Sequence, residues 1–354
     1  MKLSIKTYCL FVIVLLVCFC RPLNAQNKSI NYTETNLNFV HNGDSIFGKL
    51  IIPNQKNTAK LPVVVFVHGS GPEDYSSSEN YNYLFEEFAR IGFASYSWDK
   101  PGTGKSQGQW YDQPMSKRAT EVIAAINKLK TVESVDGNKI GLWGISQAGW
   151  VMPLVAGKIK LSFVISVSSP VTTAFDQELY RVKSELAGES YSTADIDKAI
   201  DYTREFKKII SEGKPYSDFL ELQNQIDKEK WSQIVIRGEE IIYQYLKVIL
   251  REDQVPHIEN YRCPLLAVWG ANDLLVPPIE SSEAFGKKMK EIGNSAAVIK
   301  VIAQADHTLT YNLTGNVDDT RKRREVYKDN PSMVFAPGAI PLMTDWLSGL
   351  YRKQ

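Results

Sequence analysis

Residues 139–149 read KIGLWGISQAG, and this stretch carries the strongest structural signal in the chain. Its first part, Lys139–Gly144, is an apolar run typical of a buried strand, and a helix is expected from Gln147 onward. Ser146 therefore lies on a sharp turn from strand to helix, where the residues two positions away must be small because larger side chains would collide. Glycine is usual on both sides of such a turn, and here the second position is Ala148, which is still small. This setting makes Ser146 a candidate nucleophile.

Strand and helix patterns alternate on both sides of this turn. Leu61–Val67 reads LPVVVFV, a continuous run expected for a strand that is buried on both faces of a parallel sheet. Further strands are expected at Phe93–Trp98, Phe163–Ser168, Leu265–Trp269 and Ala297–Ile302, and helices at Tyr83–Ile91, Ser116–Lys130 and Glu280–Ile292. An antiparallel hairpin is expected upstream, formed by Asn36–Val40 and Ile46–Ile52. The alternation predicts an α/β fold with a doubly wound, mostly parallel sheet.

The pattern changes between residues 171 and 260. Strand signals are absent there, and charged helical patterns occur at Asp176–Leu186, Ala194–Glu212 and Trp231–Leu250. Because the β/α alternation resumes afterwards, we interpret residues 171–260 as a helical cap inserted into one α/β core of residues 26–170 and 261–354. A separate helical domain is the alternative. Five aromatic residues are candidates to line a cap pocket, although packing within the protein explains most of them as well: Tyr191, Tyr202, Phe206, Tyr243 and Tyr245.

The composition and the amino-terminal segment limit the possible functions and the location of the protein. The 354 residues are 44% hydrophobic and 23% charged, with a formal net charge of +1. This near-neutral charge gives no indication that the protein binds nucleic acid or an anionic membrane. Lys2 and Lys6 precede an apolar run at Cys9–Cys20, and Ala25 suits cleavage, which predicts a secretory signal peptide over residues 1–25. The run is short for a membrane anchor, which needs about 20 residues. We therefore expect an exported protein, periplasmic or secreted, with no membrane-spanning segment after cleavage.

Cysteine usage gives no sign of a metal site or a disulfide. Lipidation at Cys18 or Cys20 is disfavoured because the preceding residues are bulky. Cleavage after Ala25 would leave Cys263 alone, and we expect it to be a buried structural residue because no thiol-activating neighbour adjoins it. The scattered histidines and this one cysteine have no metal-ligand spacing, so neither a metal nor another cofactor is expected.

A nucleophilic serine needs a base, and the chain has only 4 histidines. His41 lies in the hairpin turn, His68 directly follows a strand, and His257 lies in the cap. His307 follows the last predicted strand, where a loop can bring its imidazole over Ser146. We therefore expect His307 to act as the general base.

The residue that orients this histidine is expected to be Asp273. It lies just past the strand Leu265–Trp269, and a carboxylate there can hold the imidazole in the required tautomer. Asp306 adjoins His307, but neighbouring residues in an extended loop usually point apart. Asp176, after the preceding strand, is a weaker alternative.

A glycine-rich loop, His68–Pro72 (HGSGP), follows the strand Leu61–Val67. Its backbone N–H groups can point toward an oxygen that becomes negatively charged during acyl transfer. We assign the two donors of this oxyanion hole as the amides of Ser70 and Gln147, and a plain tight turn is the alternative.

Several motifs in this order resemble the α/β-hydrolase superfamily, closest to its esterase, dienelactone-hydrolase-like and serine-aminopeptidase-like branches. They are HGSGP, WDKPGTGKS, WGISQAG, GANDLLVP and a terminal Asp-His pair, and the resemblance spans Asn36 to Leu350. It implies the nucleophile, acid and base at Ser146, Asp273 and His307.

Three features depart from the family pattern. Ala148 replaces a glycine at the turn, and Lys100 stands where many relatives carry arginine, but neither position belongs to the triad. The loop HGSGP also differs from the HGGPG loop of proline iminopeptidases, which weakens a peptidase function.

The sequence thus predicts a serine hydrolase that cleaves a small carboxylic ester through an acyl-enzyme on Ser146, without a cofactor. An exported serine aminopeptidase or an acyl-thioesterase shares the triad and differs in substrate. A protein that keeps the fold and only binds a ligand is a third possibility, usually marked by a broken triad.

Overall fold

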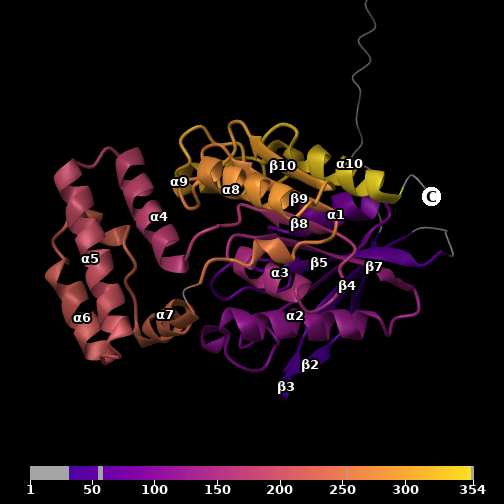
Figure 1. Cartoon of the computed structure of the whole chain (residues 1–354), viewed down its shortest axis with the longest axis horizontal. Coiled ribbons are helices and arrows are strands. Elements are labelled where there is room, and N and C mark those ends of the chain that lie inside the picture. Colours follow the sequence, from indigo (N-terminus) through magenta and orange to yellow (C-terminus); the bar gives the residue numbers. More distant parts are fainter. Residues whose placement is uncertain (1–31, 55–58, 253, 352–354) are drawn as a thin grey trace, which may run out of the picture.

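The computed structural model describes residues 32–54, 59–252 and 254–351. Its centre is an eight-stranded sheet in the order β1-β4-β6-β5-β7-β8-β9-β10 (Figure 1). The strands are β1 (Tyr32–Asn36), β4 (Gly48–Pro53), β5 (Leu61–Val67), β6 (Ala94–Trp98), β7 (Val135–Ile145), β8 (Val164–Val167), β9 (Leu265–Gly270) and β10 (Ala297–Ile302). Neighbouring strands from β6 to β10 are parallel, whereas β4 pairs antiparallel with both β1 and β6. The predicted α/β fold with a mostly parallel, doubly wound sheet is confirmed.

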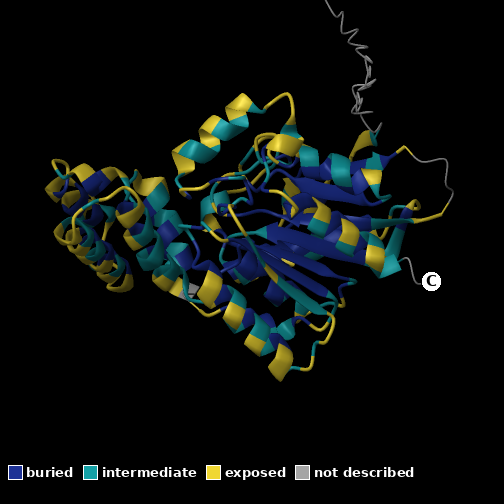
Figure 2. Cartoon of the chain, turned by 90° about the horizontal axis from the view of Figure 1, so that it is seen from above, coloured by how far each residue is buried: buried dark blue, intermediate teal, exposed yellow. Residues whose placement is uncertain are grey.

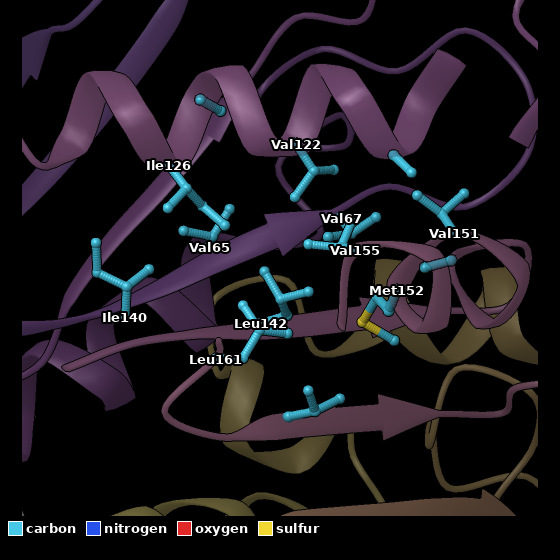
Figure 3. Packing of buried hydrophobic residues seen from close by; sticks show 14 of the residues in the cluster. Val65, Val67, Val122, Ile126, Ile140, Leu142, Val151, Met152, Val155 and Leu161 are labelled. Carbon is cyan, nitrogen blue, oxygen red and sulfur yellow. The ribbon is translucent and has the colours of Figure 1, made fainter. Parts of the chain in front are cut away.

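Alternate residues of β5 face the two sides of the sheet, as the pleat of a strand requires. Val63, Val65 and Val67 belong to one hydrophobic cluster, and Val64 and Phe66 belong to the other. The first cluster lies under α2 (Met115–Leu129), α3 (Ala148–Ala156) and α8 (Pro278–Glu291), and the second under α1 (Asn82–Arg90) and α10 (Ala339–Tyr351). Figure 3 shows side chains of α2 and α3 packed on strands of the sheet. Burying one such side chain stabilises the fold by about 1.5–3 kcal/mol, so both layers hold the sheet firmly.

Four helices form a segment of their own between β8 and β9. They are α4 (Ala174–Gly188), α5 (Thr193–Ser211), α6 (Tyr216–Gln225) and α7 (Glu240–Glu252), and they lie to one side of the sheet (Figures 1 and 2). Their apolar faces pack into a third hydrophobic cluster that is separate from the two on the sheet. The hydroxyls of Thr173 and Ser192 cap α4 and α5 by accepting hydrogen bonds from the backbone amides three residues on.

The predicted helical pattern Trp231–Leu250 is interrupted in the structure. A short 3-10 turn at Lys230–Gln233 precedes α7, which begins only at Glu240. The side-chain amide of Gln223 bonds both backbone groups of Gly238, accepting from its N–H at 2.8 Å and donating to its carbonyl at 3.1 Å. These bonds use the backbone groups that a continuous helix would need, so the helix starts after them.

The predicted antiparallel hairpin is confirmed, because Phe39 pairs with Ile46 near the turn and Asn36 pairs with Lys49 beyond it. Its inner part, β2 (Phe39–His41) and β3 (Asp44–Ile46), is a small separate sheet, and its outer part, β1 and β4, belongs to the large sheet. Gly48 permits a close approach at the junction of the two parts, because a Cβ there would lie 2.5 Å from the Tyr96 hydroxyl and 2.6 Å from the Leu37 carbonyl oxygen. The Tyr96 hydroxyl donates to the Leu37 carbonyl from β6, a long-range contact that alternation along the hairpin does not reveal.

One helix near the carboxyl end lies outside the core. α9 (Val317–Val326) has no buried residue, and its N-terminus is capped by Asn316, which accepts a hydrogen bond from the Asp318 amide at 2.8 Å. The sequence does not predict α9, because a helix without an apolar stripe gives no periodic signal.

The prediction for the amino-terminal segment and its two alternatives lie outside the described residues. These are the signal peptide over residues 1–25 and its alternatives, a retained anchor and lipidation at Cys18 or Cys20. Among the helices that the structure describes, none combines the length and apolar character needed to cross a bilayer.

Candidate active site

The predicted turn at Ser146 is present between β7 and α3. Ser146 has a φ of 56°, a left-handed conformation that costs free energy for any residue with a Cβ, and its amide donates to the Val167 carbonyl at 3.0 Å. A Cβ on Gly144 would lie only 2.7 Å from the Cβ of Ala148 and 2.8 Å from the Met152 sulfur. Glycine at 144 therefore makes room for alanine at 148, which explains why this departure from the usual pattern is tolerated.

The predicted base and acid are hydrogen-bonded to each other. His307 Nδ1 lies 2.9 Å from Asp273 Oδ2, and Asp273 is 1% exposed. The other carboxylate oxygen accepts hydrogen bonds from the amides of Leu275 and Val276, at 2.8 and 2.9 Å. The carboxylate is thus fixed from one side by backbone and can hold the imidazole from the other.

The loop that carries His307 is anchored at the edge of the sheet. The Ser168 hydroxyl, just past β8, donates to the His307 carbonyl at 2.7 Å. Gly270 ends β9 against the backbone carbonyls of Ala305 and Asp306, where a Cβ would collide. Both contacts join segments that are far apart in sequence, so the loop after β10 can reach the loop after β9.

Asp273 governs the protonation of His307. Burial by itself disfavours the charged imidazole, but the negative charge of Asp273 and its hydrogen bond favour it more strongly, with a further contribution from Asp306. The net effect raises the pKa of His307 above the ordinary value of 6.5. Asp273 therefore makes the imidazole a stronger base.

Ser146 and His307 line the same cavity, which has a volume of about 280 Å3. Within the part of the chain that the structure describes, the Ser146 hydroxyl and the free ring nitrogen of His307 form no hydrogen bond. Such bonds are often long in the absence of substrate and shorten when substrate binds. A larger hollow of about 770 Å3 lies elsewhere, lined by Ile126, Gly137 and Asn260, and contains neither residue.

The wall of this cavity comes from the α/β core. It includes Tyr81, Leu84, Trp143, Leu275, Phe335 and Met343, and none of its described residues lies between positions 171 and 260. The expectation that the helical segment forms the pocket is therefore wrong for the cavity at Ser146. The loops that follow the strands line it, together with residues of α1, α9 and α10.

Of the five cap aromatics, Tyr245 alone reaches the loops around Ser146. Tyr202, Phe206 and Tyr243 are buried in the cluster of the helical segment, and Tyr191 packs against it. The Tyr245 hydroxyl accepts a hydrogen bond from Gln147 Nε2 at 2.8 Å, and its ring lies 5.0 Å from that of Trp110. Packing thus explains four of these aromatics, and the fifth ties α7 to the turn after Ser146.

The predicted oxyanion loop lies beside Ser146. A Cβ on Gly69 would be 3.8 Å from the Ser146 Cβ, and Ser70 lines the cavity. Lys100 Nζ donates to the carbonyls of Gly69 and Gly71, at 3.0 and 2.6 Å. Because a trans peptide points its C=O and N–H in opposite directions, the Ser70 amide is turned away from Lys100. Gln147, the other predicted donor, is the N-cap of α3.

A second buried cation supports this arrangement and is missed by the sequence analysis. Arg118 Nη1 donates to Gln147 Oε1 and Nη2 to the His68 carbonyl, both at 2.5 Å. Lys100 and Arg118 are nearly fully buried, and burial lowers the pKa of both. A charged residue on the apolar stripe of α2 is a signal that could have identified Arg118.

The other histidines and the lone described cysteine have different surroundings. His41 Nε2 lies 2.9 Å from the Thr120 hydroxyl, and burial lowers the pKa of His68 to about 3. His257 lies on the surface beside Glu259. Burial raises the pKa of the Cys263 thiol to about 11, which keeps it protonated and unreactive.

The alternative carboxylates are occupied elsewhere. Asp306 Oδ1 accepts from the Thr308 and Thr310 amides, at 2.8 and 3.0 Å, as expected of a local hydrogen-bonding residue. Asp176 is exposed in the first turn of α4, where it accepts from the Thr173 hydroxyl at 2.8 Å. Neither hydrogen-bonds His307 in the described part of the chain.

Comparisons with known proteins agree with this fold. The family described as serine aminopeptidase, S33, matches residues 58–313. Hydrolase LUC6 of a Fusarium species is 27% identical over 135 residues, which cover 36% of this chain and 32% of that protein. Polyketide transferase claH of Penicillium crustosum is 34% identical over 97 residues, which cover 27% of this chain and 31% of that protein. The matches thus span about a third of these curated relatives.

Solved structures share the architecture over nearly the whole chain. The Pyrococcus furiosus esterase Pf2001 superposes with a TM-score of 0.53 at 15% identity, covering 91% of this chain and 92% of that one. Est1E from Butyrivibrio proteoclasticus, solved with ferulic acid bound, gives 0.50 at 17% identity, with 88% and 96% covered. At such identities these likenesses show the fold alone. The family match over most of the chain shows that this protein belongs to the serine aminopeptidase S33 family of α/β hydrolases.

Proposed function

We propose that this hydrolase cleaves carboxylic esters of small molecules through an acyl-enzyme on Ser146. The observation that carries the proposal is the hydrogen bond between His307 Nδ1 and Asp273 Oδ2, in a histidine that shares a cavity with a serine on a strained turn. Ordinary structural histidines do not combine a buried carboxylate partner with a cavity that also exposes a serine hydroxyl.

In the first half of the reaction, His307 Nε2 takes the proton of the Ser146 hydroxyl as the oxygen bonds to the acyl carbon. The electron pair of the carbonyl moves onto its oxygen, where the amides of Ser70 and Gln147 donate hydrogen bonds. Collapse of this intermediate expels the alcohol, which receives the proton from His307. Asp273 stabilises the imidazolium while it carries that proton.

In the second half, a water molecule gives a proton to His307 and attacks the acyl carbon. The tetrahedral intermediate forms again in the same oxyanion hole. His307 then returns the proton to the Ser146 oxygen as the carboxylic acid leaves. All of these steps use side chains and backbone amides of the chain, and none uses a cofactor.

The backbone donors are supported from the interior of the protein. Lys100 binds the Gly69 and Gly71 carbonyls, and Arg118 binds the His68 carbonyl. Donors that are fixed before the reaction stabilise a developing charge without reorganising, and each is worth about 2.7–4 kcal/mol in enzymes where one has been removed.

Amide and thioester cleavage by the same residues are the competing activities, since the family description refers to aminopeptidases. A panel of p-nitrophenyl esters, aminoacyl p-nitroanilides and acyl thioesters separates them. We expect the highest kcat/KM on the esters and loss of that activity in Ser146→Ala. Faster hydrolysis of aminoacyl anilides would make the protein an aminopeptidase instead. No turnover of any class by folded protein would favour a ligand-binding role.

We also propose that the protein is exported. The support is the basic, apolar and small-residue pattern of residues 1–25. Mass spectrometry of protein from the native host tests this, with Gln26 expected as the first residue. An intact amino terminus would contradict cleavage.

A further inference from the structure

Three buried or half-buried cations lie around Ser146, and one of them differs from the others. Lys100 donates to two loop carbonyls, and Arg118 donates to a carbonyl and to the Gln147 side chain. The negative charge of Glu121 also favours the charged form of Arg118. Both are therefore satisfied by the protein itself. The third cation, Arg324 on α9, is not.

In the Arg324 side chain, one guanidinium nitrogen donates a hydrogen bond and another buried nitrogen has no described acceptor. Its Nη1 donates to Asn80 Oδ1. Its Nε is buried and has no hydrogen-bond partner among the described residues. A buried donor left unpaired destabilises a protein, so such a group in a native structure calls for an explanation.

No carboxylate in the described residues forms an ion pair with Arg324. Burial lowers the pKa of Arg324, and the charge of Asp306 opposes this effect. The oxygens of Asp306, however, accept hydrogen bonds from Thr308, Thr310 and Thr320. The guanidinium is thus a partly desolvated cation, and no described residue supplies an anion in contact with it.

The unpaired donor belongs to a residue that lines the reaction cavity. Arg324 shares the wall of the 280 Å3 cavity with Ser146 and His307, and most of the remaining wall is apolar. An arginine in such a wall recognises a carboxylate well, because Nε and the neighbouring Nη2 form a planar edge that matches two carboxylate oxygens.

Glu73 is the other charged group in this wall apart from His307. Burial raises its pKa, while a hydrogen bond from Ser77 and the charge of Lys100 act in the opposite direction. Glu73 therefore already has partners in the protein, whereas Arg324 Nε has none. This contrast favours an anionic ligand over a cationic one.

We propose that Arg324 forms a subsite for a carboxylate at the far end of the acyl group, so that the preferred substrates are half esters of dicarboxylic acids. This inference rests on the proposed function for its acyl-enzyme chemistry. The carboxylate would bind the guanidinium of Arg324 from the cavity that this residue lines, while the ester carbonyl meets Ser146.

The kinetic test compares p-nitrophenyl half esters with neutral esters of equal chain length: glutaryl with pentanoyl, adipoyl with hexanoyl, and suberoyl with octanoyl. The readout is the ratio of kcat/KM for the charged ester to that for the neutral ester. We expect a ratio above one at the best length, and a loss of about tenfold in Arg324→Gln, the size of one charge-assisted hydrogen bond. Arg324→Lys should recover part of it.

Arg321→Gln is the matched control, because Arg321 lies on the same helix, is exposed and pairs with Asp318. It removes the same charge and should leave the ratio unchanged. A ratio that is the same in Arg324→Gln and wild type overturns the proposal. So does a preference for the aminohexanoyl ester that is lost in Glu73→Gln, because the pocket would then bind amines.

An equilibrium measurement separates this proposal from the proposed reaction. Calorimetry on Ser146→Ala with monomethyl adipate and with methyl hexanoate needs no turnover. We expect the charged ester to bind about tenfold more tightly, and Arg324→Gln in the same background to remove the difference. Equal binding of both esters overturns the subsite, whereas this preference without hydrolysis by wild type would contradict the reaction alone.

Discussion

The α/β core and the helical segment α4–α7 are both packed around buried apolar residues, but they contribute unequally to the candidate site. The core supplies the whole described wall of the cavity at Ser146, from loops at the carboxyl ends of its parallel strands. The helical segment has its own cluster, centred on Phe206, Phe219 and Tyr243. It contacts the loops of the site through Tyr245, which accepts from Gln147, and through Tyr180, which donates to the Asp273 carbonyl at 3.0 Å.

An insertion can therefore be well packed without forming the wall of this cavity. Parallel strands gather the loops after β5, β7, β9 and β10 at one edge of the sheet, so the reacting groups converge whatever is inserted between β8 and β9. We therefore expect substitutions in the core loops to change the chemistry, and those in the helical segment to change mainly its own stability.

The largest expected effect is on the nucleophile. Ser146→Ala should lower kcat for esters by about a million-fold, the loss seen when the nucleophile of a serine protease is removed. Circular dichroism and the thermal midpoint should stay those of wild type, because no described hydrogen bond uses the hydroxyl. Substantial esterase activity in this variant would place the chemistry outside the core loops.

The next largest effect concerns Asp273. Asp273→Asn should lower kcat by about ten-thousandfold, as the same change does in a serine protease. The pH profile sharpens the test. His307 acts only when deprotonated, so activity rises with pH through the pKa of His307, which in wild type lies above 6.5.

Loss of the Asp273 charge lowers the pKa of His307, so the rising limb of kcat/KM should move to lower pH in Asp273→Asn. An unmoved limb would mean that Asp273 does not set the protonation of His307. Asp306→Asn serves as the comparison, because Asp306 acts on His307 only through its charge and should move the limb less.

A third prediction addresses the helical segment directly. Phe219→Ala removes a fully buried ring that packs on Phe206 and Tyr243, and should cost about 3–5 kcal/mol of the stability of that cluster. The kcat/KM for short esters should stay within about twofold of wild type. This is well below the tenfold loss that would follow if the substitution destabilised the transition state by about 1.4 kcal/mol.

Phe85→Ala, on α1, is the matched change in the sheet cluster. Hydrogen exchange should show increased opening in α5–α7 for the first variant and around α1 for the second. Increased exchange in the β9 and β10 loops of Phe219→Ala would show that the two regions are coupled.

The smallest expected effect is at the hydrogen bond between Tyr245 and Gln147, one of the links between the two regions. Tyr245→Phe removes a neutral hydrogen bond to Gln147, worth about 0.5–1.5 kcal/mol, so kcat should fall by up to about tenfold. Tyr243→Phe removes a hydroxyl that donates to the Lys214 carbonyl within the helical segment, and kcat should not change. Equal losses in both variants would contradict a specific role for Tyr245.

The sequence predicts the core better than the insertion, for a physical reason. The spacing of apolar residues along a buried strand or an amphipathic helix shows which of its faces is buried, so these elements can be recognised from the sequence alone. The expected strand Ala297–Ile302 matches β10, and the expected helix Ser116–Lys130 lies within one residue of α2. The start of α7 instead depends on Gln223 bonding Gly238, and α9 has no apolar face to detect.

The same reason limits what the sequence predicts of the site. Ser146, His307 and Asp273 each follow a recognisable strand, so their order and residue types identify them, and the structure joins the last two by a hydrogen bond. The partners of Lys100, Arg118 and Arg324 lie far away in sequence, and no local pattern reveals whether a buried cation is satisfied.

Reaction with a fluorophosphonate, followed by peptide mass spectrometry, tests whether His307 activates Ser146. The reagent reacts with serines that a neighbouring base activates, so we expect one adduct, on Ser146, that forms far more slowly in His307→Ala. Folded protein that stays unlabelled, or an adduct on another serine, would contradict it.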